Sequence, residues 1–149
     1  MHRTIVPDIV SNQRLVFAEE STSVRDAVRM MVDNNVSAVM ITARGCLEGI
    51  FTERDLAAKI VAPGLDPDGV TVGAVMTRDP DTVRPQDTPR SAIEKMRSRG
   101  YRHLPVVEGV AVVGMVSVRD LYSAALGEAD EDLRDLDSFI HGPGYGVSP

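Results

Sequence analysis

Apolar residues recur at helical spacing in two stretches of the chain that lie 65 positions apart. The first stripe follows the spacing i, i+3, i+4, i+7 and consists of Val24, Ala27, Val28 and Met31. The second stripe aligns with it and consists of Ala92, Ile93 and Met96. This spacing predicts one amphipathic helix in each half of the chain. Ser23 and Thr88 precede these helices and are predicted to cap them.

Shorter apolar runs on either side of each helix predict strands. In the first half they cover 15–18, 39–41 and 47–52, with a turn at 44–45. In the second half they cover 82–83, 104–107 and 111–116, with a turn at 108–109. A further helix closes each half, over 53–61 in the first and from 118 to about 126 in the second. Each half therefore has the predicted order strand, helix, strand, strand, helix.

This order predicts a mixed α/β fold of the α+β kind, built from two β-α-β-β-α repeats. A turn-rich linker at 65–69 separates the two. We assign 1–69 to the first repeat with its N-terminal lead-in and linker, 70–126 to the second repeat, and 127–149 to an acidic tail. Because each repeat has only about 60 residues and one apolar sheet face, we expect the repeats to bury those faces against each other.

Charge distinguishes the tail from the rest of the chain. Six acidic residues against Arg134 give a net charge of −5 between 128 and 137, whereas the whole chain carries −6. Leu133, Leu136 and Ile140 fall at i, i+3 and i+7, so two interpretations stay open: a solvated acidic extension, or a helix that docks on a partner subunit. The segment 141–146 is rich in glycine and is not expected to continue a helix.

Composition excludes several classes of function. No basic face is strong enough to predict binding to nucleic acid, because acidic and basic residues are interleaved outside the tail. No apolar run approaches the roughly 20 residues that span a bilayer, so no membrane segment is expected. The N-terminus lacks the apolar region of a secretion signal, which predicts a soluble cytoplasmic protein. The single cysteine, Cys46, cannot form an internal disulfide.

The strongest chemical signal is a short motif that occurs twice. Residues 49–56 and 114–121 each contain a glycine, two apolar residues, a hydroxyl residue and an acid three positions later. Thr52 and Ser117 stand where a strand meets a helix, and backbone amides there favour a phosphate. Asp55 and Asp120 can accept hydrogen bonds from the hydroxyls of a ribose. The alternative is that each pair only caps its helix; the presence of two copies favours the nucleotide site.

Further candidates surround the motifs. Arg102 and His103 could contact a phosphate, or form only a solvated strand end, and Arg54 and Arg119 could reach phosphates or pair with acids. Four apolar positions could hold a flat base or belong to the core: Val83, Ile50, Met115 and Pro105. No catalytic triad, P-loop or metal-spaced His or Cys set is visible, so no catalytic residue, metal or required cofactor is predicted and an enzyme is not expected.

The motifs at 49–55 and 114–120 resemble those of a tandem pair of cystathionine β-synthase (CBS) domains, a Bateman module. Residues 75–77 and 102–107 support the resemblance, which covers about residues 5–126. It implies two β-α-β-β-α units packed sheet to sheet with pseudo-twofold symmetry. It also implies clefts for adenosine-containing ligands: AMP, ADP, ATP, NAD or S-adenosylmethionine.

By position in that family, Asp55 and Asp120 would hold ribose, and Thr52, Ser117, Arg102 and His103 would contact phosphate. The first repeat departs from the pattern with Ser37 and Ala38 opposite Arg102 and His103, so equal occupancy of the two clefts is not expected. The resemblance implies a homodimer that regulates a separate, unknown protein partner. The hypotheses are thus an adenine-nucleotide sensor, a structural dimeric interaction module with vestigial clefts and, last, an enzyme acting on the bound nucleotide.

Overall fold

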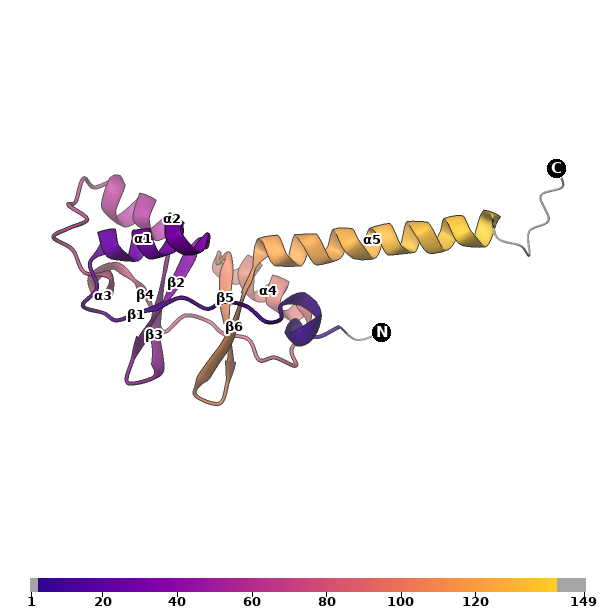
Figure 1. Cartoon of the computed structure of the whole chain (residues 1–149), viewed down its shortest axis with the longest axis horizontal. Coiled ribbons are helices and arrows are strands. Elements are labelled where there is room, and N and C mark those ends of the chain that lie inside the picture. Colours follow the sequence, from indigo (N-terminus) through magenta and orange to yellow (C-terminus); the bar gives the residue numbers. More distant parts are fainter. Residues whose placement is uncertain (1–2, 142–149) are drawn as a thin grey trace.

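Residues 3–141 are described in a computed structural model, which contains two sheets side by side and one long projecting helix (Figure 1). The first sheet has the order β1-β2-β3-β4, formed by Phe17–Ala18, Ala38–Ala43, Cys46–Thr52 and Thr77–Arg78. Strand β1 pairs parallel to β2, and the other neighbours are antiparallel. The second sheet consists of β5 (His103–Glu108) and β6 (Ala111–Ser117), an antiparallel pair.

The two sheets keep the same register and the same irregularity. A register shift lies between Ile41 and Thr42 in the first hairpin and between Val106 and Val107 in the second, again 65 positions apart. The strand predicted at 82–83 is reduced to a single parallel bridge from Val83 to Val106. The mixed α+β fold of two β-α-β-β-α repeats is confirmed, with strands β3 and β6 in contact between the sheets.

The helices begin where the sequence predicts. Helix α1 (Val24–Asn34) is capped by Ser23, whose hydroxyl accepts from the Asp26 amide at 3.1 Å. Helix α4 (Pro89–Arg99) is capped by Thr88, which accepts from the Ser91 amide at 3.1 Å. In the first repeat the closing helix is α2 (Glu53–Leu56), continued by the π-helix η2 (Ala57–Val61).

Helix α5 (Val118–His141) is longer than the sequence predicted. Instead of ending near residue 126, it continues through the acidic tail and projects from the body (Figure 1). Gly127 costs the helix about 1 kcal/mol relative to alanine, too little to end it between good helix formers. His141 is the last helical residue, and the rest of the segment 141–146 lies outside the described residues.

Each core is completed by a lead-in segment that is distant in sequence. The short helix α3 (Val72–Val75) follows the linker, yet Val72 and Met76 are buried in the first core. The N-terminal π-helix η1 (Ile5–Ile9) places Ile5 in the second core, where it is fully buried. The cores therefore cross the boundary that we assigned at 69/70, and neither repeat is expected to fold without the other's lead-in.

The side chain of Gln13 forms hydrogen bonds with the backbone at the open edge of β6, as a neighbouring strand would. Its side-chain amide donates to the Met115 carbonyl at 2.8 Å and accepts from the Met115 amide at 2.9 Å. We expect Gln13→Leu to lower the free energy of unfolding by about 1 kcal/mol, because two hydrogen bonds are lost at a partly solvated edge. Urea denaturation measures this cost. Gln86→Leu is the matched control, since Gln86 is exposed and makes no hydrogen bond with the described residues; equal costs would contradict the assignment.

Candidate functional site

Two clefts lie at the junction of the repeats, and each contains one copy of the repeated motif. The Asp55 cleft has a volume of about 500 Å³ and combines Thr52 and Asp55 with Tyr101 and Arg102 of the other repeat. The Asp120 cleft has a volume of about 930 Å³ and combines Ser117 and Asp120 with residues 35–38 of the other repeat. Each cleft therefore joins the motif of one repeat to the helix–strand corner of its neighbour.

Asp55 holds a reciprocal cap at the start of α2. Its Oδ2 atom accepts from the Thr52 amide at 3.0 Å and from the Thr52 hydroxyl at 3.2 Å, and the Asp55 amide donates to that hydroxyl at 3.2 Å. The Oδ1 atom faces Lys59 Nζ at 3.2 Å and accepts from the Thr77 hydroxyl at 3.5 Å. Both carboxylate oxygens thus have partners within the protein, and a ribose would have to share them.

Asp120 makes the same cap with one oxygen left open. Its Oδ2 atom accepts from the Ser117 amide at 2.8 Å, and its own amide donates to the Ser117 hydroxyl at 3.1 Å. Among the described residues, none donates to Oδ1 of Asp120. Both hydroxyl–acid pairs, Thr52 with Asp55 and Ser117 with Asp120, thus cap their helices, which is the alternative that the sequence left open. A carboxylate can accept about four hydrogen bonds, so the cap leaves Asp120 able to bind a diol as well.

The motif glycines allow a close approach of the protein's own chain. A Cβ atom on Gly49 would lie 2.6 Å from Met76 Sδ and 2.7 Å from the Thr77 carbonyl oxygen. A Cβ atom on Gly114 would lie 3.1 Å from Gln13 Oε1. The lead-in segments occupy the space over both glycines, so the packing of β4 requires a glycine at 49, whereas the contact of Gln13 with Gly114 is less tight.

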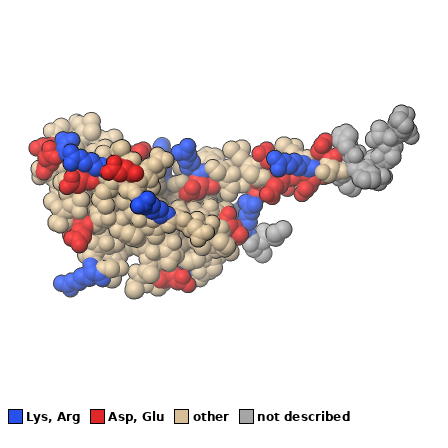
Figure 2. Space-filling model, in the orientation of Figure 1, with Lys and Arg blue, Asp and Glu red and all other residues tan. Residues whose placement is uncertain are grey.

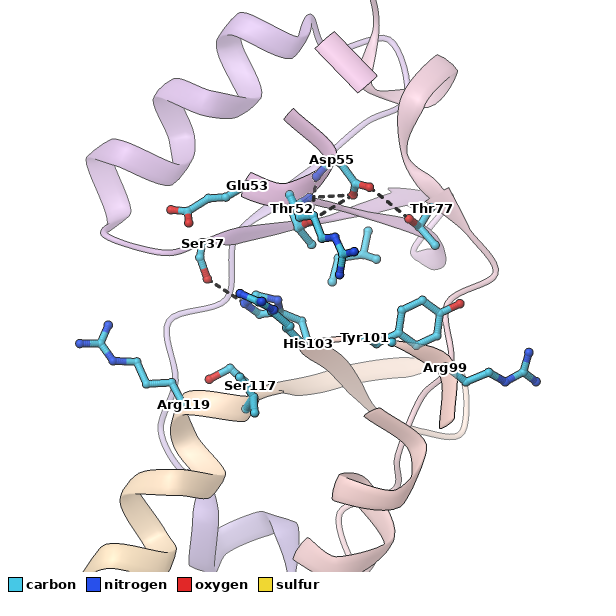
Figure 3. A pocket seen from close by; sticks show the side chains of 15 residues that line it. Ser37, Thr52, Glu53, Asp55, Thr77, Arg99, Tyr101, His103, Ser117 and Arg119 are labelled. Atoms are coloured by element: carbon cyan, nitrogen blue, oxygen red, sulfur yellow. Dashed lines mark hydrogen bonds between the residues drawn. The ribbon is translucent and has the colours of Figure 1, made fainter. Parts of the chain in front are cut away.

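His103 lies between the two clefts and lines both of them. Its Nε2 atom is 2.7 Å from the Ser37 hydroxyl of the other repeat, and the two side chains face each other across the junction (Figure 3). Burial lowers the pKa of His103 below its ordinary value, although the carboxylates of Asp120, Glu53 and Asp55 oppose that shift. At neutral pH the ring is therefore in its neutral form, although a carboxylate of the repeated motif lies in each of the two clefts beside it.

Positive charge gathers mainly around the Asp55 cleft. The predicted phosphate contacts Arg54, Arg102 and Arg119 all line it, and they form no ion pair with the described residues. Arg99 also lines this cleft but is paired with Asp81 at 3.3 Å. Arg119 reaches the Asp120 cleft as well, where Ser37 takes the place that Arg102 has in its counterpart. The structure thus brings the predicted cations together on one cleft.

The four predicted base contacts separate into two groups. Ile50 lines the Asp55 cleft and Met115 lines the Asp120 cleft. Val83 is 1% exposed within the second core, and Pro105 is buried in β5 beside Met115, so neither lines these clefts. Sequence reasoning missed several apolar residues of the Asp120 cleft, namely Leu15, Val36, Ala38 and Met40. The 65-residue offset could have found Val36, because it aligns with Tyr101 in the other cleft.

The described residues, 3–141, offer few features for metal binding, thiol chemistry or insertion into a membrane. No cluster of three or more His, Cys, Asp or Glu side chains between residues 3 and 141 is arranged to hold a metal. Cys46 is exposed at the start of β3. No described helix combines the length and apolar character that crossing a membrane requires. The cytoplasmic location expected from the sequence stays a prediction.

The fold is a tandem pair of β-α-β-β-α repeats with two clefts at their junction. The family model of the CBS domain matches residues 6–62 and 72–127, and the chain belongs to the CBS domain family. It is 36% identical over 128 residues to the mitochondrial CBS domain-containing protein CBSX3 of Arabidopsis thaliana. That alignment covers 83% of this chain and 62% of the relative. The chain spans only 20% of another relative from the same organism, CBSCBSPB2.

Two solved structures of similar proteins contain adenosine compounds. One is a CBS domain protein from Pyrobaculum aerophilum complexed with AMP, with a TM-score of 0.70 and 29% identity over 80% of this chain and 95% of that one. The other is a CBS domain pair in complex with 5′-methylthioadenosine and S-adenosyl-L-methionine, with a TM-score of 0.76 and 26% identity over 86% of this chain and 99% of that one. Similar structures thus contain different classes of adenosine compound. The residues that line each cleft therefore decide which class fits this chain.

Proposed function

We propose that this protein is a regulatory sensor of adenine nucleotides, which bind in the clefts between its two CBS repeats. The observation that carries the proposal is the composition of the clefts: an acid able to hold a ribose stands in each, and guanidinium groups without ionic partners among the described residues line the junction. AMP in one similar structure and S-adenosyl-L-methionine in another support an adenosine compound. The arginines favour a ligand that carries phosphate.

The two clefts are suited to different parts of such a ligand. The Asp120 cleft offers an apolar lining and an open carboxylate oxygen, which fits adenine and ribose. The Asp55 cleft offers Arg54, Arg102 and Arg119, which fit phosphates. Since His103 and Arg119 line both clefts, phosphates of a nucleotide in the Asp120 cleft would point toward the cations of its neighbour. We infer that nucleosides bind first in the Asp120 cleft.

Regulation requires a second protein or a second copy of this one. Val32 on α1 is 73% exposed and Ile93 on α4 is 40% exposed, so both repeats present apolar helical surface. This surface supports a homodimer, and one structural neighbour is a hexamer. A nucleotide that bridges the repeats would shift the equilibrium of the assembly by its differential affinity for the two states.

Thermal unfolding with and without ligand tests the proposal. We expect AMP, ATP or NAD at about ten times its Kd to add roughly 1.4 kcal/mol to the free energy of unfolding. Asp120→Asn keeps an oxygen that can cap the helix but removes the charge, so it should reduce that gain. Asp33→Asn is the matched control, because Asp33 is exposed and lines neither cleft. Absence of any shift with AMP, ADP, ATP, NAD or S-adenosylmethionine would overturn the proposal.

A second candidate function is a purely structural interaction module. The observation that favours it is that both hydroxyl–acid pairs are satisfied as helix caps. It predicts that the double variant Asp55→Asn and Asp120→Asn regulates its partner normally, whereas the sensor proposal predicts loss of the response to nucleotide.

A further inference from the structure

A row of apolar side chains lies exposed along helix α5. The spacing alternates between four and three residues, and the row consists of Tyr122, Leu126, Ala129, Leu133 and Leu136, which we call the α5 seam. Tyr122, Leu126, Leu133 and Leu136 are 68%, 67%, 64% and 55% exposed. This spacing corresponds to the a and d positions of a heptad repeat, which face the partner helix in a coiled coil.

The charges beside the seam all have one sign. Asp130 and Asp137 take the e position of the repeat and Asp132 takes the g position, so aspartates flank the seam on both sides. Arg134, the one basic residue between 128 and 138, takes the b position, away from the seam. Figure 2 shows acidic groups, with basic atoms among them, along the part of the molecule that projects from the body.

The body of the protein leaves this part of α5 without support. Every side chain from 129 to 138 is exposed, and Arg3 forms an ion pair with Glu128 at 3.0 Å just before this stretch. A stretch as short as 129–138 would be marginal as an isolated helix in water. Packing of a partner on the seam would supply the missing apolar contact.

We propose that the α5 seam docks a basic amphipathic helix of a separate protein, in a two-helix coiled coil. Leucines of the partner would pack on Leu133 and Leu136, and lysines or arginines at its e and g positions would face Asp130 and Asp132. A second copy of this chain fits poorly, because in either orientation its own flanking residues are aspartates and would repel. The proposal is independent of the nucleotide sites, so either can fail alone.

Binding of two synthetic peptides by the full chain tests the proposal. Both peptides are about four heptads long, with leucine at a and d; one carries lysine at e and g, and the other carries glutamate. We expect the lysine peptide to bind about tenfold or more tightly, with weaker binding at high salt. Equal binding of both peptides, or no binding of the lysine peptide, would overturn the proposal. Isothermal titration calorimetry gives both dissociation constants.

Matched variants separate seam recognition from bulk charge. Asp130→Lys with Asp132→Lys should transfer the preference to the glutamate peptide. Glu131→Lys with Asp135→Lys changes the net charge equally at positions away from the seam and should keep the preference for lysine. Leu133→Gln with Leu136→Gln should abolish binding, whereas Ser138→Gln should not. Circular dichroism checks that each of these variants stays helical. Equal effects of the two charge pairs would overturn the proposal.

Sedimentation equilibrium tests whether a second copy of this chain covers the α5 seam. If the oligomeric state is the same in the wild type and in the double leucine variant, a second copy does not cover the seam, as we expect. Dissociation of an oligomer by Leu133→Gln with Leu136→Gln would instead assign the seam to self-association and contradict the proposal.

Discussion

Gly49→Ala is expected to lower the free energy of unfolding by about 3 kcal/mol, within the range for forced overpacking of a core. The added methyl group would lie 2.6 Å from Met76 Sδ and 2.7 Å from the Thr77 carbonyl oxygen. Met76 is only 6% exposed in the first core, and Thr77 belongs to β4, so neither can move without loss. Strand β4 should separate from β3. Urea denaturation followed by circular dichroism measures the loss.

Gly114→Ala is the matched control, because Gly114 is the same motif position in the second repeat. Its nearest contact would be Gln13 Oε1 at 3.1 Å, followed by Val106 at 3.4 Å. The end of a glutamine side chain can move, and alanine reduces the entropy of the unfolded chain, so we expect a cost below about 1 kcal/mol. Equal costs for the two substitutions would show that packing of the lead-in segment over Gly49 is not what requires a glycine there.

The repeat itself made much of the fold predictable. Two apolar stripes and two capping residues at a constant offset predicted α1 and α4, and Ser23 and Thr88 accept the expected amide hydrogen bonds. The ion pair of Asp55 with Lys59 could also have been predicted, since the two are four residues apart on one helix. Local spacing carries this information because helices and hairpins satisfy most of their hydrogen bonds within a few residues.

Contacts between distant segments were not predictable in the same way. The sequence indicated two motifs, but not that the Asp55 motif meets Arg102 while the Asp120 motif meets Ser37. That pairing depends on how the two sheets pack. The same packing buries Ile5 in the second core and places His103 against Ser37, and neither residue carries a local signal of these contacts.

Arg102→Gln is expected to weaken the binding of AMP or ATP by about 10- to 100-fold, the usual range for losing a hydrogen bond to a charged group. This prediction rests on the proposed function. Arg102 is exposed in the Asp55 cleft and pairs with no acid among the described residues, so its charge is available to a ligand. Adenosine should bind the variant as well as the wild type, because it has no phosphate. Titration calorimetry compares the two ligands.

Arg97→Gln is the control for that substitution, because Arg97 lies on α4 outside both clefts. It removes the same charge from the same repeat. We expect the Kd of AMP or ATP to change by less than about twofold, because solvent and salt largely screen an exposed charge outside the clefts. Equal losses of AMP and adenosine affinity in Arg102→Gln would mean that the arginine supports the shape of the cleft rather than a phosphate.

His103 should make nucleotide binding depend on pH. Burial lowers its pKa in the ligand-free fold, so the folded ring takes up a proton only below the ordinary value of about 6.5. Between the pKa of His103 in the folded chain and its pKa in the unfolded chain, the unfolded chain then binds more protons. The free energy of unfolding should therefore fall as the pH decreases through about 6.5. A phosphate beside His103 would raise that pKa again, because negative charge favours the imidazolium.

Binding of a nucleotide should therefore take up a proton at His103, and affinity should rise as the pH falls toward about 6.5 and below it. NAD is the best probe, because its diphosphate does not titrate in that range and any change belongs to the protein. His103→Gln keeps a polar group that can bond to Ser37 but cannot take up the proton, so its affinity for NAD should be independent of pH. Calorimetry in buffers of different ionisation enthalpy counts the protons directly. Equal proton uptake by the wild type and His103→Gln would assign the pH dependence to another group and leave His103 as a neutral hydrogen-bonding residue between the clefts.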